Sequence, residues 1–149
     1  MHYSITKNDD PFHIRLTPTG EASWIRFQWM FTEVASIVAG FDRPPILLDE
    51  RMSSLDRLDT WDFMKAYDFL LEKNDILAHT KLAILANPGR DHDVMHRFKQ
   101  LAQNGSRATI EVFETEEAAI DWLRGTTVTW INSIMPLLTV PLGFLLACG

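Results

Sequence analysis

The sequence has a single cysteine, Cys148, which excludes an internal disulfide framework and a structural zinc site built from several thiolates. Basic residues are also few: 14 Lys and Arg stand against 20 Asp and Glu, giving a formal net charge of -6. Such an acidic chain lacks the positive surface of a general nucleic-acid binder, so we expect no nucleic acid among its partners. Residues 1–10 have neither a basic start nor a long apolar run, which predicts a cytoplasmic protein without a signal peptide.

Charge is absent from the C-terminal end of the chain. All Lys, Arg, Asp and Glu lie between Lys7 and Arg124, and residues 125–149 contain none. We therefore expect one domain at 1–124, which is an ordinary size for a single hydrophobic core. We expect an apolar C-terminal tail at 125–149.

The tail allows three interpretations. Segment 127–148 is as long as the roughly 20 apolar residues that cross a bilayer, which predicts lipid or membrane contact and association with the inner membrane. Pro136 and Pro141 would interrupt a spanning helix, which favours instead an extended arm packed on the domain or on a second copy. The third interpretation is a disordered tail.

Periodicity predicts the first elements. Segments 2–6 and 12–17 alternate between apolar and polar residues and predict a hairpin with a turn at 7–11. Residues 21–39 have the period of an amphipathic helix. Its inward stripe would be Trp24, Phe27, Phe31, Val34 and Val38.

The rest of the domain alternates strands and helices. Buried strands are predicted at 44–49, 81–87 and 109–113, and helices at 59–77, 91–103 and 116–123. Asp59 or Thr60 would cap the helix at 59–77, and the segment 50–58 would be a loop. The order β-β-α-β-α-β-α-β-α predicts an α/β fold with a mostly parallel mixed sheet of about five strands.

Four segments carry a resemblance to a known family: HYSIT at 2–6, ILLDER at 46–51, KLAIL at 81–85 and VFETEEAAIDWL at 112–123. They resemble STAS-like domains, the sulfate transporter and anti-sigma factor antagonist group. Within that group they are similar to small bacterial proteins called STAS-like or SEC14-like domain proteins. The resemblance covers about residues 1–124. It implies a STAS-like fold and a non-enzymatic regulator that binds protein partners.

The resemblance also implies candidate switch residues. In the anti-sigma factor antagonist branch, a serine at the start of the helix after the third strand is phosphorylated, in an Asp-Ser-Ser-Gly type motif. The corresponding stretch here, 55–63, lacks Ser-Gly, and Thr60 is the nearest counterpart. Ser53 and Ser54 lie in the preceding loop. Each of the three is also explained as a cap or an ordinary polar loop residue.

Metal and cofactor chemistry has weak support in the sequence. His92 and His96 are four residues apart, a spacing that can hold a metal, but no third ligand is evident and the pair is expected on a solvated helix face. Asp49 begins an acidic cluster at the end of a predicted strand, and this cluster matches no hydrolase motif. We expect no metal, no cofactor and no catalytic residue, and a metal-dependent hydrolase is the least favoured function.

Two apolar groups remain as candidate sites. Ile25 and Trp29 point away from the inward stripe of their helix and form a candidate interaction surface for a protein partner or a second copy. A candidate ligand cavity is lined by Phe31, Phe63, Tyr67 and Leu70. The predicted function is a non-catalytic regulatory or protein-interaction module. The alternative is a carrier or sensor of a lipid or another apolar ligand.

Overall fold

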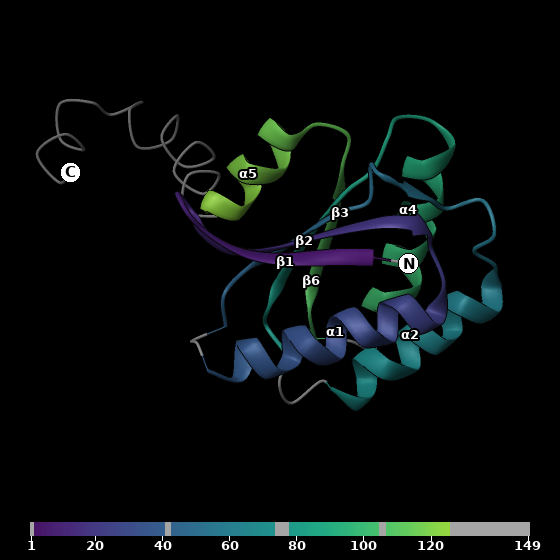
Figure 1. Ribbon diagram of the computed structural model, residues 1–149, viewed down its shortest axis with the longest axis horizontal. Helices are drawn as coiled ribbons and strands as arrows, with labels where there is room; N and C mark the ends of the chain where they lie inside the picture. Colours follow the sequence, from purple (N-terminus) through teal and green to yellow (C-terminus); the bar gives the residue numbers. More distant parts are fainter. Residues whose placement is uncertain (1, 41–42, 74–77, 105–106, 126–149) are drawn as a thin grey trace, which may run out of the picture.

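The computed structural model describes residues 2–40, 43–73, 78–104 and 107–125. Its sheet has six strands, with the order β1-β2-β3-β5-β6 and the short β4 paired to β2 off this path (Figure 1). Only the β1–β2 pair is antiparallel. The elements are β1 (His2–Asp9), β2 (Phe12–Glu21), α1 (Trp24–Ala39), β3 (Ile46–Asp49), β4 (Ser53–Ser54), α2 (Thr60–Glu72), β5 (Lys81–Leu85), α4 (Arg90–Gln103), β6 (Thr109–Phe113) and α5 (Glu116–Arg124).

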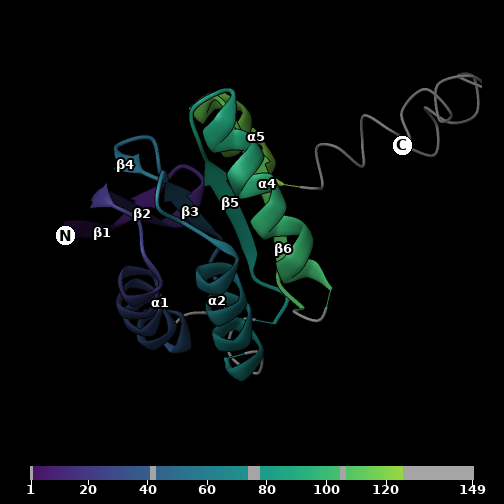
Figure 2. The same cartoon turned by 90° about the vertical axis from the view of Figure 1, so that its right-hand side faces the viewer.

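The sheet separates two apolar layers of unequal size. Alternation along β3 sends Ile46 and Leu48 into the larger layer, which α1, α2 and α4 cover. Leu47 points into the smaller layer, where it meets Ala119 and Leu123 of α5. Figure 1 shows α5 across the sheet from α1 and α2, and Figure 2 shows α1 and α2 side by side. The mostly parallel α/β architecture predicted from the sequence is confirmed.

The ends of several elements differ from the prediction. The hairpin strands continue through most of the expected turn, so that only Asp10 and Pro11 separate β1 from β2. Helix α1 begins at Trp24, not at Glu21, because the Ser23 side chain accepts a hydrogen bond from the Arg26 amide and caps it there.

The start of helix α2 agrees with one of the two caps predicted from the sequence. Asp59 is the cap, and Thr60 is the first helical residue. The helix ends at Glu72, earlier than the predicted end at Leu77, which lies outside the described residues. Residues 50–58 were expected to be a loop throughout, but Ser53–Ser54 pairs with the end of β2 as β4. Two residues are too few to show a strand period, so periodicity could not reveal this strand.

The predictions for the C-terminal tail concern residues that the structure does not describe, apart from Gly125. Within the described residues, no helix has both the length and the apolar composition that a membrane crossing requires.

Candidate functional site

A pocket opens beside the N-terminal ends of α1 and α2, and encloses a cavity of about 40 Å³. Leu48 of β3 and Glu50, which directly follows this strand, line the inner side of the pocket. Met95 and Phe98 of α4 close it. We call it the Arg26 pocket, after the one cation that lines it. Its lining residues are Ala22, Ser23, Trp24, Arg26, Phe27, Met30, Leu48, Glu50, Leu58, Asp62, Phe63, Ala66, Met95 and Phe98.

Arg26 is buried because it lies on the side of α1 that faces the sheet. It is spaced by four residues from Met30 and by eight from Val34, both fully buried, and its own side chain is 2% exposed. The guanidinium Nη2 donates to both carboxylate oxygens of Glu50, at 2.7 and 2.9 Å. Nη1 donates to the Ser53 hydroxyl at 3.1 Å. One nitrogen thus donates to both carboxylate oxygens in a charge-assisted contact, which differs from the two parallel hydrogen bonds of a fork-shaped Arg–carboxylate pair.

Glu50 is held in place by its backbone as well as its side chain. Its amide donates to the Leu85 carbonyl at 2.8 Å, which continues the parallel pairing of β3 with β5 by one step. Burial raises the pKa of the Glu50 carboxyl above its ordinary value, although the charge of Arg26 and the Ser53 hydrogen bond act in the opposite direction. The ion pair with Arg26 therefore compensates only part of the desolvation of this carboxylate.

The guanidinium of Arg26 does not use all of its donors. The Nε–H group has no hydrogen-bond partner among the described residues, although the side chain is almost fully buried. A buried donor without an acceptor costs about 1–3 kcal/mol, and more when the group is charged.

Asp62 stands at the mouth of the Arg26 pocket and caps two helices. Its Oδ1 accepts from the Trp24 amide of α1 at 2.9 Å, and its Oδ2 accepts from the Asp59 amide at 3.2 Å. In return, Asp59 Oδ1 accepts from the Asp62 amide at 3.0 Å, which completes a capping box for α2. The starts of α1 and α2 are thus joined through one carboxylate.

The candidate switch residues lie in different surroundings. Ser53 is buried, and its hydroxyl also lies 3.1 Å from the Pro18 carbonyl, so it is inaccessible to a modifying enzyme in this conformation. Ser54 and Thr60 are exposed. Thr60 lies between Asp59 and Asp62, whose carboxylates would repel a phosphate placed on it.

The candidate cavity residues do not gather around one cavity. Phe63 lines the Arg26 pocket, whereas Phe31 and Leu70 are packed into the larger layer and Tyr67 is half-buried. The Arg26 pocket lies near the starts of α1 and α2, a position that the inward stripes of these helices do not indicate.

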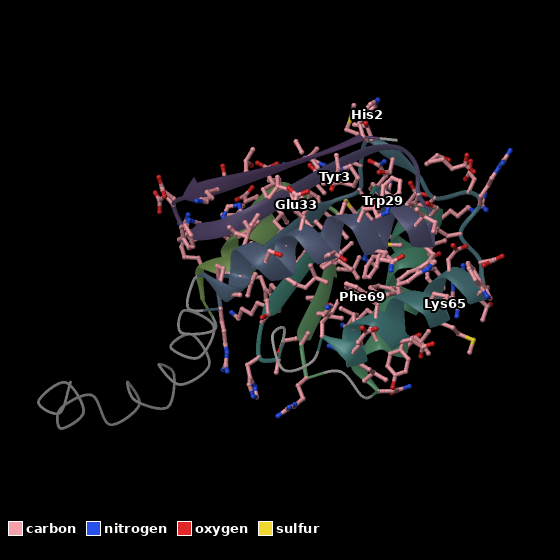
Figure 3. The ribbon with its side chains drawn as sticks, turned by 60° about the horizontal axis from the view of Figure 1, so that its bottom comes forward. His2, Tyr3, Trp29, Glu33, Lys65 and Phe69 are labelled. Carbon is pink, nitrogen blue, oxygen red and sulfur yellow. The ribbon has the colours of Figure 1, made fainter. Side chains whose placement is uncertain are left out.

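Ile25 and Trp29 lie on the outer side of α1, as their spacing predicts. Their exposed fractions are 46% and 56%, against 1% for Phe31 on the inner side of the same helix. Figure 3 shows Trp29 one turn from Glu33, which accepts a hydrogen bond from the Tyr3 hydroxyl of β1 at 2.9 Å. The side chains of Ile25 and Trp29 form what we call the α1 surface.

The acidic cluster after β3 is divided by the sheet. Asp49 accepts from Arg15 Nη2 at 2.8 Å and from Arg51 Nε at 3.0 Å, and both guanidinium groups also reach Glu116. Burial alone would raise the pKa of Asp49, but the hydrogen bonds from Arg51 and Arg15 outweigh it and hold the pKa below its ordinary value. Asp49 is therefore committed to structural ion pairs.

The histidine pair of α4 is less exposed than predicted. His92 and His96 stack on each other with ring centroids 6.2 Å apart, and both are half-buried, where the sequence indicated a solvated face. The mutual stacking covers part of each ring. Across the described ranges, no three His, Cys, Asp or Glu side chains come together in a way that could hold a metal ion.

No family model and no curated protein matches the sequence. A solved structure does match: an uncharacterised protein of the DUF3478 family from Shewanella loihica PV-4, described as having a SpoIIAA-like fold. The two chains are 18% identical, the match covers 82% of this chain and 92% of the other, and the TM-score is 0.56.

The fold is SpoIIAA-like. The SpoIIAA-like fold is a STAS-like fold, so the STAS-like architecture expected from the sequence is confirmed. At this identity the SpoIIAA-like fold is what the two chains share, and the match assigns no site.

The central residues of the Arg26 pocket were not among the predicted sites. One signal was present: Arg26 continues the four-residue spacing of Met30, Val34 and Val38, which places it on the buried side of α1. Glu50 directly follows an uncharged apolar run, but its burial depends on β5 and α1, which are distant in sequence. Only the assembled fold shows that these two residues meet.

Proposed function

We propose that this protein is a non-catalytic regulatory module that recognises a protein partner, or a second copy, through the α1 surface. The observation that carries the proposal is the exposure of Ile25 and Trp29, two large apolar side chains one turn apart on a helix that is otherwise buried on its inner side. Large apolar and aromatic side chains are the usual anchors of protein interfaces. The SpoIIAA-like fold agrees with a regulatory role.

A photo-reactive amino acid at position 29 tests the proposal in cells that express the full chain. Trp61 is the matched control, because it is 57% exposed and lies on α2. We expect a discrete crosslinked species from position 29 and none from position 61. Addition of Ile25→Glu should abolish that species. Equal crosslinking at both positions, or none at either, would contradict the α1 surface as the site of recognition.

We also propose that segment 127–148 holds the protein at the inner membrane. The support is its composition, because it contains no charged residue over the length that crosses a bilayer. The full chain should remain in the membrane fraction after a carbonate wash, and a chain that ends at Arg124 should be released. If the full chain is also released, tethering is wrong.

The carrier function has one observation in its favour, the presence of the Arg26 pocket. Pockets that hold lipid-sized or drug-sized ligands have volumes of about 300–1,000 Å³. The Arg26 pocket offers about 40 Å³, which is far smaller, so it does not contain a lipid in this conformation.

A further inference from the structure

The two edges of the sheet, β1 and β6, differ in how their backbones are protected. Strand β6 has five residues, and side chains already use two of its backbone groups. The Gln103 side chain of α4 donates to the Ile110 carbonyl at 3.0 Å, and the Val112 amide donates to the Glu111 carboxylate at 3.3 Å. The β6 edge is therefore partly closed to a further strand.

Strand β1 forms a longer and more regular edge. All eight of its residues pair with β2 in one unbroken register, and the strand contains no proline. Within the described residues, no strand pairs with its outer side and no side chain bonds to the backbone of residues 3–6. Figure 2 shows β1 at the outer end of the sheet, with the ribbon of α1 farther in. Natural sheets often shield such an edge by bulges, prolines or short strands, and β1 has none of these three.

The outer edge of β1 is suited to an extended backbone, because only another strand matches the regular spacing of its amide and carbonyl groups. A second copy of β1 supplies such a strand. Two identical strands pair antiparallel about a twofold axis perpendicular to the sheet, which keeps the matching faces of the two sheets on the same side. Residues that lie opposite each other must then come from the same face of β1.

The alternation of β1 decides which residues can lie opposite each other. Tyr3 and Ile5 pack against the larger layer, and the exposed Ser4 and Thr6 lie on the other face. One register places Ile5 opposite Ile5 of the second copy, and Ser4 opposite Thr6. This register pairs residues 2–8, joins apolar with apolar and hydroxyl with hydroxyl side chains, and opposes no like charges.

The two neighbouring registers that keep the faces matched are less favourable. In one of them, Ile5 lies opposite Lys7 and Tyr3 lies opposite Asp9, so the apolar pair is lost. The other pairs only residues 2–6. The register centred on Ile5 therefore combines the longest pairing with the best match of side chains.

We propose that β1 pairs antiparallel with β1 of a second copy in the register centred on Ile5, so that the two sheets join into one. The twofold axis is perpendicular to the sheet, so both α1 helices lie on the same face of the joined sheet. The α1 surface takes no part in the pairing of the strands. This proposal therefore does not rest on recognition through the α1 surface, and the two are tested independently.

Disulfide trapping in cells that express the full chain tests the pairing. One tagged chain carries Ser4→Cys, a second carries Thr6→Cys, and both carry Cys148→Ser. Opposite residues of an antiparallel pair have Cβ atoms about 4.5–5.5 Å apart, which is close to the separation in a disulfide. With a membrane-permeable oxidant, we expect a mixed disulfide when both chains are co-expressed and none when either is expressed alone. Thr32→Cys, at an exposed site of α1, replaces Thr6→Cys as the control and should give none.

Charge variants test the register by sedimentation equilibrium of the full chain in detergent solution. Every chain also carries Ile25→Glu, so that the α1 surface makes no contribution to self-association. Ser4→Glu with Thr6→Glu places carboxylates opposite each other in the joined sheet and should weaken self-association at least tenfold. Ser4→Lys with Thr6→Glu places opposite charges there and should preserve it.

The proposal is overturned if the co-expressed chains form no mixed disulfide, if the Thr32→Cys control forms one equally well, or if both charge variants associate equally. A disulfide from Ser4→Cys to a different protein, in place of the second copy, would also overturn it, because β1 would then pair with another partner.

Discussion

Asp49 and Glu50 are neighbours in the chain, yet their pKa values shift in opposite directions. Asp49 points to the α5 side of the sheet, where hydrogen bonds from Arg51 and Arg15 outweigh the effect of burial. Glu50 points to the other side, where burial outweighs the contribution of Arg26. The alternation of a strand thus gives two adjacent carboxylates different chemical surroundings.

The shift of Asp49 predicts a pH-dependent stability. Because its pKa is lowered on folding, its contribution is present above the ordinary value of 3.8 and is lost as pH falls through the lower folded value. Asp49→Asn should reduce the free energy of unfolding by about 2 kcal/mol near neutral pH, and the difference should shrink in acid. Urea denaturation at several pH values measures it. Asp68→Asn, at an exposed site of α2, should show no such difference.

Glu50 contributes with the opposite sign. Its raised pKa means that its contribution is complete below the ordinary value of 4.5 and is lost as pH rises through the folded value. The acid limb of the wild-type stability profile should therefore follow Asp49 and Glu116, whose pKa values are both lowered. A pH-independent cost of Asp49→Asn would show that its charge is not what stabilises the fold.

Among the elements, α1 shows what sequence reasoning can and cannot supply. The three-four spacing from Trp24 to Val38 correctly separated the buried side of the helix from the exposed Ile25 and Trp29. Arg26 is not part of that series but lies on the buried side of the helix, four residues before Met30, and a cation at such a position is ambiguous until its partner is known. That partner is Glu50, which directly follows β3 and lies 24 positions from Arg26 in the sequence. Local periodicity carries no information about such a contact.

The shared cap predicts unequal effects of two aspartates on α1 and α2. Asp59→Ala removes the acceptor of one amide, that of Asp62, and should cost about 1 kcal/mol. Asp62→Ala removes the acceptor of both the Trp24 and the Asp59 amides and should cost about 2 kcal/mol. Chemical denaturation compares the two variants. Equal costs would show that the hydrogen bond to Trp24 does not stabilise α1.

At the scale of the whole molecule, the two sides of the sheet are unequal. The larger layer joins three helices through aromatic contacts. The ring centroid of Phe98 in α4 lies 5.9 Å from the ring centroids of both Phe27 in α1 and Phe63 in α2. Among the helices that the structure describes, α5 is the one that covers the smaller layer, where Phe113 packs against Trp122. The order of strands and helices, visible in the sequence, was sufficient to predict the sheet. The Arg26 pocket, which lies at the starts of α1 and α2 and is closed by α4, was not predictable, because it depends on how closely these helices approach one another.

Two phenylalanine substitutions compare the layers. Phe98→Ala should lower the free energy of unfolding by about 4 kcal/mol, since this side chain is 4% exposed and contacts two other helices. Phe113→Ala should cost roughly 2 kcal/mol, because Phe113 is only half-buried in the smaller layer. Equilibrium unfolding monitored by circular dichroism measures both. A larger loss from Phe113→Ala would show that the α5 side dominates stability.

The carboxylate of Asp62 also has a consequence for motion. Because it accepts from an amide at the start of α1 and from the cap of α2, neither helix can lift from the sheet at this end without losing a hydrogen bond of the other. The two helices should therefore open as one cooperative unit. Amide hydrogen exchange at Trp24 and Asp62 should then proceed with similar opening free energies, although these residues are separated by an entire helix, two strands and a loop.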